Sequence, residues 1–254
     1  MTSEEIHEAV RLIKQELRGM MNGVVSHSMR EKGLAYKVNF GVELPRLQDY
    51  AAELRQRFAP MQNESEQGGS ALYSLALRLW NEPIRECRLL AGMLMPPEAM
   101  DEQTAELWVE QMHFPEEAEC TVLHLFQHLS PAADLAFRWI AREEPMFQFC
   151  GWLLMARLFM QGREPSQRDA DELLDQAATV LRDFALQPAP QAFLQASVPS
   201  ASSAQSSPSA TVPGGISARP LPLAATVHKA LLKYMGTSPT AEARGEELLS
   251  ALNL

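Results

Sequence analysis

Residues 75–95 read LALRLWNEPIRECRLLAGMLM, and this stretch decides the fold. Leu75 and Trp80 lie on an apolar stripe with helical spacing, Pro83 marks a stop and a restart, and Cys87 lies on a second stripe. The stretch therefore predicts two helices joined by a tight corner. Because such a hairpin cannot bury its apolar faces alone, we expect similar hairpins to stack on either side of it.

Two sets of residues recur along the chain with a similar period. Tryptophans near the end of the first helix of each predicted hairpin are spaced by 28 and 31 residues. Cysteines that begin a C-x-x-L motif in the second helix of each hairpin are spaced by 33 and 30 residues. These markers are Trp80, Trp108 and Trp139, and Cys87, Cys120 and Cys150. The shared period is typical of paired-helix solenoids, with the tryptophans and cysteines in the core.

The pattern predicts an all-α fold in which residues 1–254 form a single domain, a right-handed α-α superhelix. The first helix is expected to end before Gly33. Segment 188–222 is rich in Pro, Ser and Ala, which predicts a linker or a long surface loop. Residues 223–254 are expected to form a terminal helical repeat.

Composition and charge limit the possible functions. The chain carries a net charge of -10, and residues 61–130 hold 12 acidic against three basic side chains. That region is a poor footprint for DNA unless its charges separate onto different faces. The apolar runs are too short to span a membrane, and the acidic N-terminus does not resemble a secretion signal. We therefore expect a cytoplasmic protein.

Three segments resemble the DNA alkylation repair enzymes, which are DNA glycosylases built from HEAT-like helical repeats. Residues 40–45, FGVELP, look like the family's Gly-hydrophobic-x-x-Pro turn, and residues 79–86, LWNEPIRE, look like its Leu-Trp-x-x-Pro-x-Arg-Glu hairpin. Residues 139–141, WIA, are similar to a later repeat. The resemblance covers about residues 1–165 and 223–254 and implies a HEAT-like solenoid whose concave, basic face holds duplex DNA.

The resemblance also implies a site, at which this sequence departs from the family. Some members excise N3- or N7-alkylated purines with an aspartate flanked by tryptophans and an arginine. The family's Ser-Trp-Trp-Asp-x-Val-Asp segment falls on residues 113–119, which places Glu119 at the catalytic aspartate and Pro115 at a key tryptophan. The arginine falls at Phe149, and the second tryptophan falls near Lys229.

Excision of a cationic base requires a carboxylate to stabilise the developing positive charge and aromatic walls to hold the base. Glu119 is the candidate catalytic residue, and Phe114 is the nearby aromatic candidate for nucleic-acid binding. Lys229 and Lys233, spaced i,i+4, are candidate phosphate contacts. These residues also have purely structural interpretations. Carboxylates in the first turn of a helix interact favourably with the helix dipole, and exposed lysines are commonly solvated surface residues without a binding role.

Other charged motifs have similarly open interpretations. Glu82, Arg85 and Glu86 have helical-neighbour spacing, which indicates solvated charges or charges that bridge repeats. His124 and His128 are spaced i,i+4, a metal-binding spacing, but no H-E-x-x-H motif accompanies them. We expect neither a metal nor a cofactor.

Three hypotheses follow. The first is a DNA alkylation repair-like protein that has lost or reduced its glycosylase activity and still binds DNA. The second is an active alkylpurine DNA glycosylase that uses Glu119. The third is an acidic solenoid scaffold that binds a protein or peptide in its groove.

Overall fold

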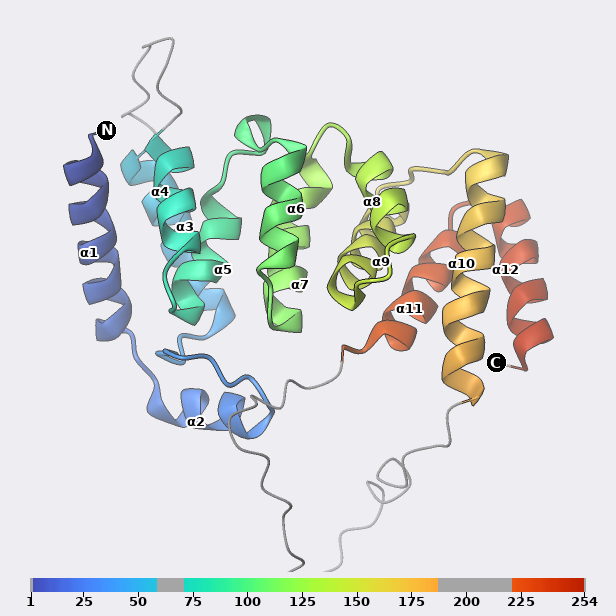
Figure 1. Ribbon diagram of the computed structural model, residues 1–254, viewed down its shortest axis with the longest axis horizontal. Coiled ribbons are helices and arrows are strands. Elements are labelled where there is room, and N and C mark those ends of the chain that lie inside the picture. The colour runs from blue at the N-terminus through green and yellow to red at the C-terminus, as the bar shows by residue number, and fades with distance from the viewer. Residues whose placement is uncertain (1, 59–70, 187–220, 254) are drawn as a thin grey trace, which may run out of the picture.

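The computed structural model describes residues 2–58, 71–186 and 221–253 (Figure 1). These residues form helices and no β-strand, with one isolated bridge between Val38 and Ile84, which confirms the all-α prediction. The helices are α1 (Ser3–Gly19), α2 (Gly23–Glu31), α3 (Leu44–Phe58), α4 (Ala71–Trp80), α5 (Arg85–Leu94), η2 (Pro97–Ala99), α6 (Glu102–Glu110), α7 (Pro115–His124), η3 (Phe126–His128), α8 (Ala132–Ile140), α9 (Pro145–Met160), α10 (Gln167–Leu186), α11 (Leu223–Met235) and α12 (Pro239–Leu252).

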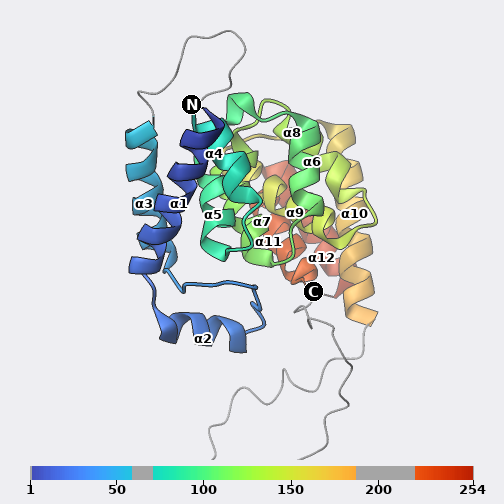
Figure 2. The ribbon, with the colours of Figure 1, turned by 60° about the vertical axis from the view of Figure 1, so that its left-hand side comes forward.

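The helices are arranged as a solenoid with two rows (Figures 1 and 2). In the inner row, α3, α5, α7, α9 and α11 each contact the next helix in that order. On the outer side, α4 packs on α5, α8 packs on α9, and α10 packs on α11. This arrangement confirms the predicted helical solenoid. Apart from Leu221 and Pro222, the predicted linker 188–222 lies outside the described residues. None of the described helices is both long and apolar enough to cross a membrane.

The repeat markers are core residues, as predicted. The indole rings of Trp80 and Trp108 stack in parallel with their centroids 4.1 Å apart, so two successive outer helices share one aromatic contact. Trp139 packs edge-on against Phe126 and Phe147. All three cysteines are free and buried. The period read from the sequence is therefore the period of the packing between hairpins.

Two charged side chains of the α4–α5 hairpin, Arg85 and Glu86, are buried rather than solvated. The Glu86 carboxylate is 0% exposed and accepts hydrogen bonds from the backbone N–H groups of Phe40 at 3.1 Å and Val42 at 3.2 Å. Arg85 donates to both carboxylate oxygens of Glu116, at 2.7 and 2.8 Å, and to the Val42 carbonyl. These charges connect the N-terminal segment, α5 and α7. Of the two interpretations drawn from the sequence, Arg85 and Glu86 therefore fit charges that bridge repeats and not solvated charges.

The expected first helix is interrupted in the structure. The chain forms α1 and α2, and the break falls at Met20–Asn22. The Asn22 side chain accepts hydrogen bonds from the N–H groups of Val24 and Val25 and so starts a new helix. Gly41, with a φ of +72°, lies against the Asn22 carbonyl, where a Cβ atom would clash at 2.2 Å.

Replacement of Glu86 tests the buried network. We expect Glu86→Ala to reduce the free energy of unfolding by about 3–5 kcal/mol. The variant leaves two N–H groups buried without an acceptor, and it removes one of the two carboxylates that neutralise Arg85, whose Nη1 atom lies 3.3 Å from Glu86 Oε1. Glu98→Ala, at an exposed position of η2, should change it by less than about 0.5 kcal/mol. Urea unfolding followed by circular dichroism measures both. A small effect of Glu86→Ala would show that water replaces the lost carboxylate.

The close packing around Gly151 predicts that replacement by alanine lowers the stability of the protein. A Cβ atom at this position of α9 would lie 2.7 Å from the Ile140 Cγ2 atom and 2.8 Å from the Ile140 nitrogen. Although alanine favours helices, we expect Gly151→Ala to destabilise the protein by about 1–3 kcal/mol through overpacking. Gly19→Ala is the control, because no atom lies within 4 Å of the added Cβ there. Thermal unfolding should separate the two variants, and equal melting temperatures would contradict the close packing of α8 on α9.

Candidate nucleic-acid interface

One face of the inner row curves inward. The Nε2 atoms of Gln48 on α3 and His124 on α7 lie 3.3 Å apart, although α5 lies between these two helices in the row. Side chains that meet across an intervening helix indicate a concave surface. We call this surface the inner face, and it carries Gln48, His124 and the neighbouring Arg157. Glu119 and Lys229 lie near each other on α7 and α11 of the same row of helices.

Four cationic or titratable nitrogen groups gather on the inner face. They come from α3, α7, η3 and α9, and they are Arg55, His124, His128 and Arg157, which we call the inner-face cluster. Burial lowers the pKa of His124, and the positive charges of Arg55, His128 and Arg157 lower it further. Burial and the neighbouring guanidinium groups therefore favour the neutral form of His124.

The two arginines of the cluster have no carboxylate partner among the described residues. Arg55 donates to the Met93 carbonyl, and the Arg157 Nε atom donates to the Gln127 side chain at 3.0 Å. These neutral acceptors orient the guanidinium groups and leave their charge uncompensated. An uncompensated, oriented guanidinium can bind a phosphate.

Four acidic side chains of the middle region are either neutralised or placed away from the inner face. Glu102 and Glu110 lie on the outer helix α6. Glu116 and Glu117 on α7 form ion pairs with Arg85 and Arg88, respectively. Apart from Glu119, which is exposed on α7, these charges therefore separate from the inner face, which was the condition for DNA binding by so acidic a chain.

The structure brings together two of the predicted site residues, Glu119 and Lys229. The Glu119 side chain is exposed on α7, yet surrounding protein limits its hydration and raises its pKa. The negative charge of Glu116 raises this pKa further, while the positive charge of Lys229 on α11 lowers it. Lys233 is also exposed on α11, one turn further along, and is not among the groups that shift Glu119.

The aromatic candidate lies away from Glu119. Phe114 precedes α7, is 7% exposed, and packs against Tyr36 with ring centroids 4.0 Å apart. Phe149, at the position of the family's arginine, is 0% exposed. Glu119 therefore has neither an aromatic wall from Phe114 nor a guanidinium from position 149.

Sequence reasoning missed Arg55 and Arg157, and it considered His124 and His128 only as metal ligands. No group of three or more metal-binding side chains occurs among the described residues. Arg55 and Arg157 are single arginines of two different helices, without a local motif. Only the curvature of the solenoid brings them together, so no signal within one hairpin could have identified them.

Comparison with known proteins gives a family and a fold. A family model described as DNA alkylation repair enzyme matches residues 13–187. A solved structure from a family related to the HEAT-like repeat DNA glycosylases, with affinity for branched DNA structures, superposes with a TM-score of 0.61 at 14% sequence identity. The match covers 95% of this chain and 82% of the other. A comparison with curated proteins found no match.

The pairing of Glu119 with Lys229 can be tested by titration. We expect Lys229→Met to raise the pKa of the Glu119 carboxyl further, because the variant removes the positive charge that stabilises the carboxylate. Lys233→Met removes an equal charge from the same helix and should leave this pKa nearly unchanged. Carbon-13 NMR of the glutamate carboxyl groups measures both. Equal shifts in the two variants would contradict the specific proximity of Lys229.

Proposed function

This chain belongs to the family of DNA alkylation repair enzymes, and on that basis we propose that it binds DNA through its inner face and has lost or reduced its glycosylase activity. The observation that carries the binding proposal is the inner-face cluster. Arg55 and Arg157 present uncompensated charge on a concave surface, and cations of this kind replace the counterions of DNA phosphates. The structural neighbour's affinity for branched DNA gives further support.

The reduced activity is inferred from the surroundings of Glu119. A glycosylase of this kind must hold a cationic base beside the carboxylate, and aromatic side chains do so by cation-π contact. Phe114 is buried against Tyr36, and Pro115 stands where the family has a tryptophan. The carboxylate is thus retained without the walls that would hold its substrate.

One observation favours the alternative of an active alkylpurine DNA glycosylase. Glu119 is exposed on α7, the helix that ends at His124 of the cluster, so a base in DNA bound there can approach its carboxylate. Lys229 is close enough to stabilise the ionised form of Glu119 and to contact a neighbouring phosphate. The third hypothesis, an acidic scaffold for a protein or peptide, is favoured by the acidic side chains of α6.

DNA binding predicts a measurable dependence on salt. The logarithm of the association constant for a fluorescent duplex should fall steeply with the logarithm of salt concentration. Arg55→Ala and Arg157→Ala should each weaken binding and make this slope less steep by about 1. Arg138→Ala is the control, because Arg138 lies on the outer helix α8 and pairs with Glu102 at 2.6 Å. Absence of binding at low salt would leave the scaffold hypothesis.

A base-release assay on alkylated duplex DNA tests the enzymatic part. We expect the wild-type protein to release little or no base above the buffer rate. If release is clear and Glu119→Gln abolishes it while DNA binding is retained, the active-glycosylase alternative is correct. Release that is unaffected by Glu119→Gln would exclude this carboxylate as the catalytic group.

A further inference from the structure

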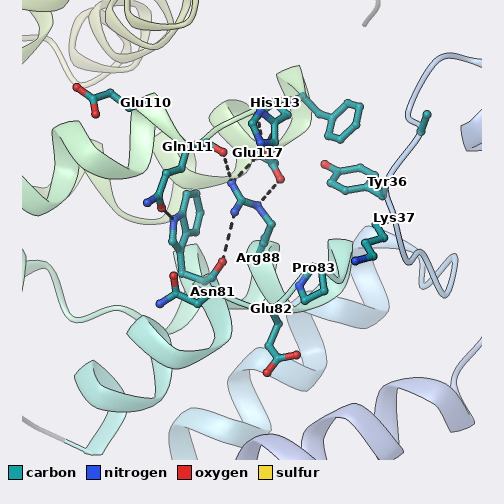
Figure 3. Close-up of a pocket in the computed structure, with 13 residues that line it drawn as sticks. Tyr36, Lys37, Asn81, Glu82, Pro83, Arg88, Glu110, Gln111, His113 and Glu117 are labelled. Atoms are coloured by element: carbon teal, nitrogen blue, oxygen red, sulfur yellow. Dashed lines mark hydrogen bonds and ion pairs between the residues drawn. The ribbon is translucent and has the colours of Figure 1, made fainter. Parts of the chain in front are cut away.

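A second concave site lies at the edge of the solenoid, outside the inner-face cluster (Figure 3). It has a volume of about 720 Å³, which is large enough for a small organic ligand. Its walls come from residues 35–37, the α4–α5 turn at 80–83, and the α6–α7 turn at 110–114. The walls thus join the N-terminal segment to two successive hairpins.

The inner end of this pocket contains an unsatisfied polar atom. Tyr36 is 8% exposed, and its hydroxyl makes no close hydrogen bond to a described residue, although it interacts with the nearby Glu116 carboxylate. Figure 3 shows this hydroxyl directed toward Arg88 and Glu117. Burial and the nearby carboxylates of Glu117 and Glu116 raise the pKa of Tyr36, so the hydroxyl remains a hydrogen-bond donor. A ligand with a matching acceptor would remove the cost of this buried donor.

The charges inside the pocket leave one cation uncompensated. The Arg88 guanidinium is neutralised by Glu117, with the Arg88 Nε and Glu117 Oε1 atoms 2.5 Å apart. The Glu82 carboxylate pairs with Lys14 at 2.8 Å and points away from Arg88 (Figure 3). Lys37 is exposed next to Tyr36 and has no ion pair among the described residues. The Lys37 side of the rim can therefore receive a negatively charged group, whereas Glu110, a lining carboxylate without an ion pair among the described residues, lies on the opposite side (Figure 3).

The remaining walls are flat and apolar. The rings of Tyr36 and Phe114 form a tilted pair, and the Pro83 ring lines the same pocket. Aromatic and proline rings beside a hydroxyl donor suit a planar heterocycle, and Lys37 at the rim suits a phosphate. These are the two parts of a nucleotide.

We propose that this pocket binds one unpaired nucleotide of a DNA strand, with its base between Pro83 and the Tyr36–Phe114 pair and its phosphate at Lys37. The inference rests on the proposed function, because the same DNA would lie on the inner face. Phe114 precedes the first residue of α7, and His124 of the inner-face cluster is the last residue of this 10-residue helix. A helix of that length spans about 15 Å, so a single DNA molecule can reach both sites.

Fluorescence anisotropy on two labelled DNAs tests the proposal. One is a blunt duplex, and the other is the same duplex with a short single-stranded flap. We expect wild-type protein to bind the flapped DNA about fivefold or more tightly, as stacking of one base on aromatic rings allows. Lys37→Ala, Tyr36→Phe and the pocket-filling variant Ala35→Trp should reduce this ratio toward one with little change in blunt-duplex affinity. Lys32→Ala is the matched control, because Lys32 is an exposed lysine of the same segment outside the pocket.

The outcomes separate this inference from the proposed function. If the wild-type protein binds both DNAs equally, the pocket proposal is wrong and DNA binding by the inner face stands. Arg157→Ala should weaken binding to both DNAs and leave the ratio of the two affinities unchanged.

Titration with a single-stranded hexanucleotide tests the pocket without a duplex. Saturable binding that Lys37→Ala and Ala35→Trp weaken supports the proposal even if duplex binding fails. No binding, or binding that neither variant changes, overturns it. Circular dichroism of each variant tests whether the variant is folded. If Ala35→Trp is unfolded, the test rests on Lys37→Ala, which changes an exposed side chain.

Discussion

The buried network around Arg85 and Glu86 is the constraint on which the rest of the structure depends. Burial of these charges would cost several kcal/mol each if they were unpaired. They remain because Glu86 accepts the Phe40 and Val42 N–H groups and Arg85 holds both oxygens of Glu116. An apolar contact would tolerate sliding, whereas these directional bonds fix the N-terminal segment, α5 and α7 in one register.

This network also sets the electrostatics of the inner face. Glu116 is held by Arg85 at the start of α7, and its negative charge is one cause of the raised pKa of Glu119 three residues further on. The same anchoring places His124 at the far end of α7 within the field of Arg55 and Arg157. A structural ion pair and a candidate functional carboxylate are therefore neighbours on one short helix, and the scaffold determines the protonation of the site.

Sequence patterns within and between neighbouring hairpins were sufficient to predict the fold, because they reflect helix capping and the packing of adjacent hairpins. Asp101 and Ser238 accept hydrogen bonds at helix starts, and the tryptophan period follows from stacking between adjacent hairpins. The break at Asn22 was missed because the apolar spacing continues across it. The burial of Arg85 and Glu86 was left open because their partners lie in other repeats. The inner-face cluster was missed for the same reason, since its members meet only through the curvature of the solenoid.

The net charge of -10 is compatible with the two uncompensated arginines of the inner-face cluster because salt screens the interactions between distant exposed charges. At physiological ionic strength the Debye length is about 8 Å. Acidic side chains more than a Debye length away therefore contribute little to the field that a phosphate would experience beside Arg55 or Arg157. For the proposed DNA complex, the total negative charge would slow association, and the cluster would determine the strength of the bound state. Net charge alone was thus a poor guide to the partner, and the distribution of charge between the two helical rows is the relevant quantity.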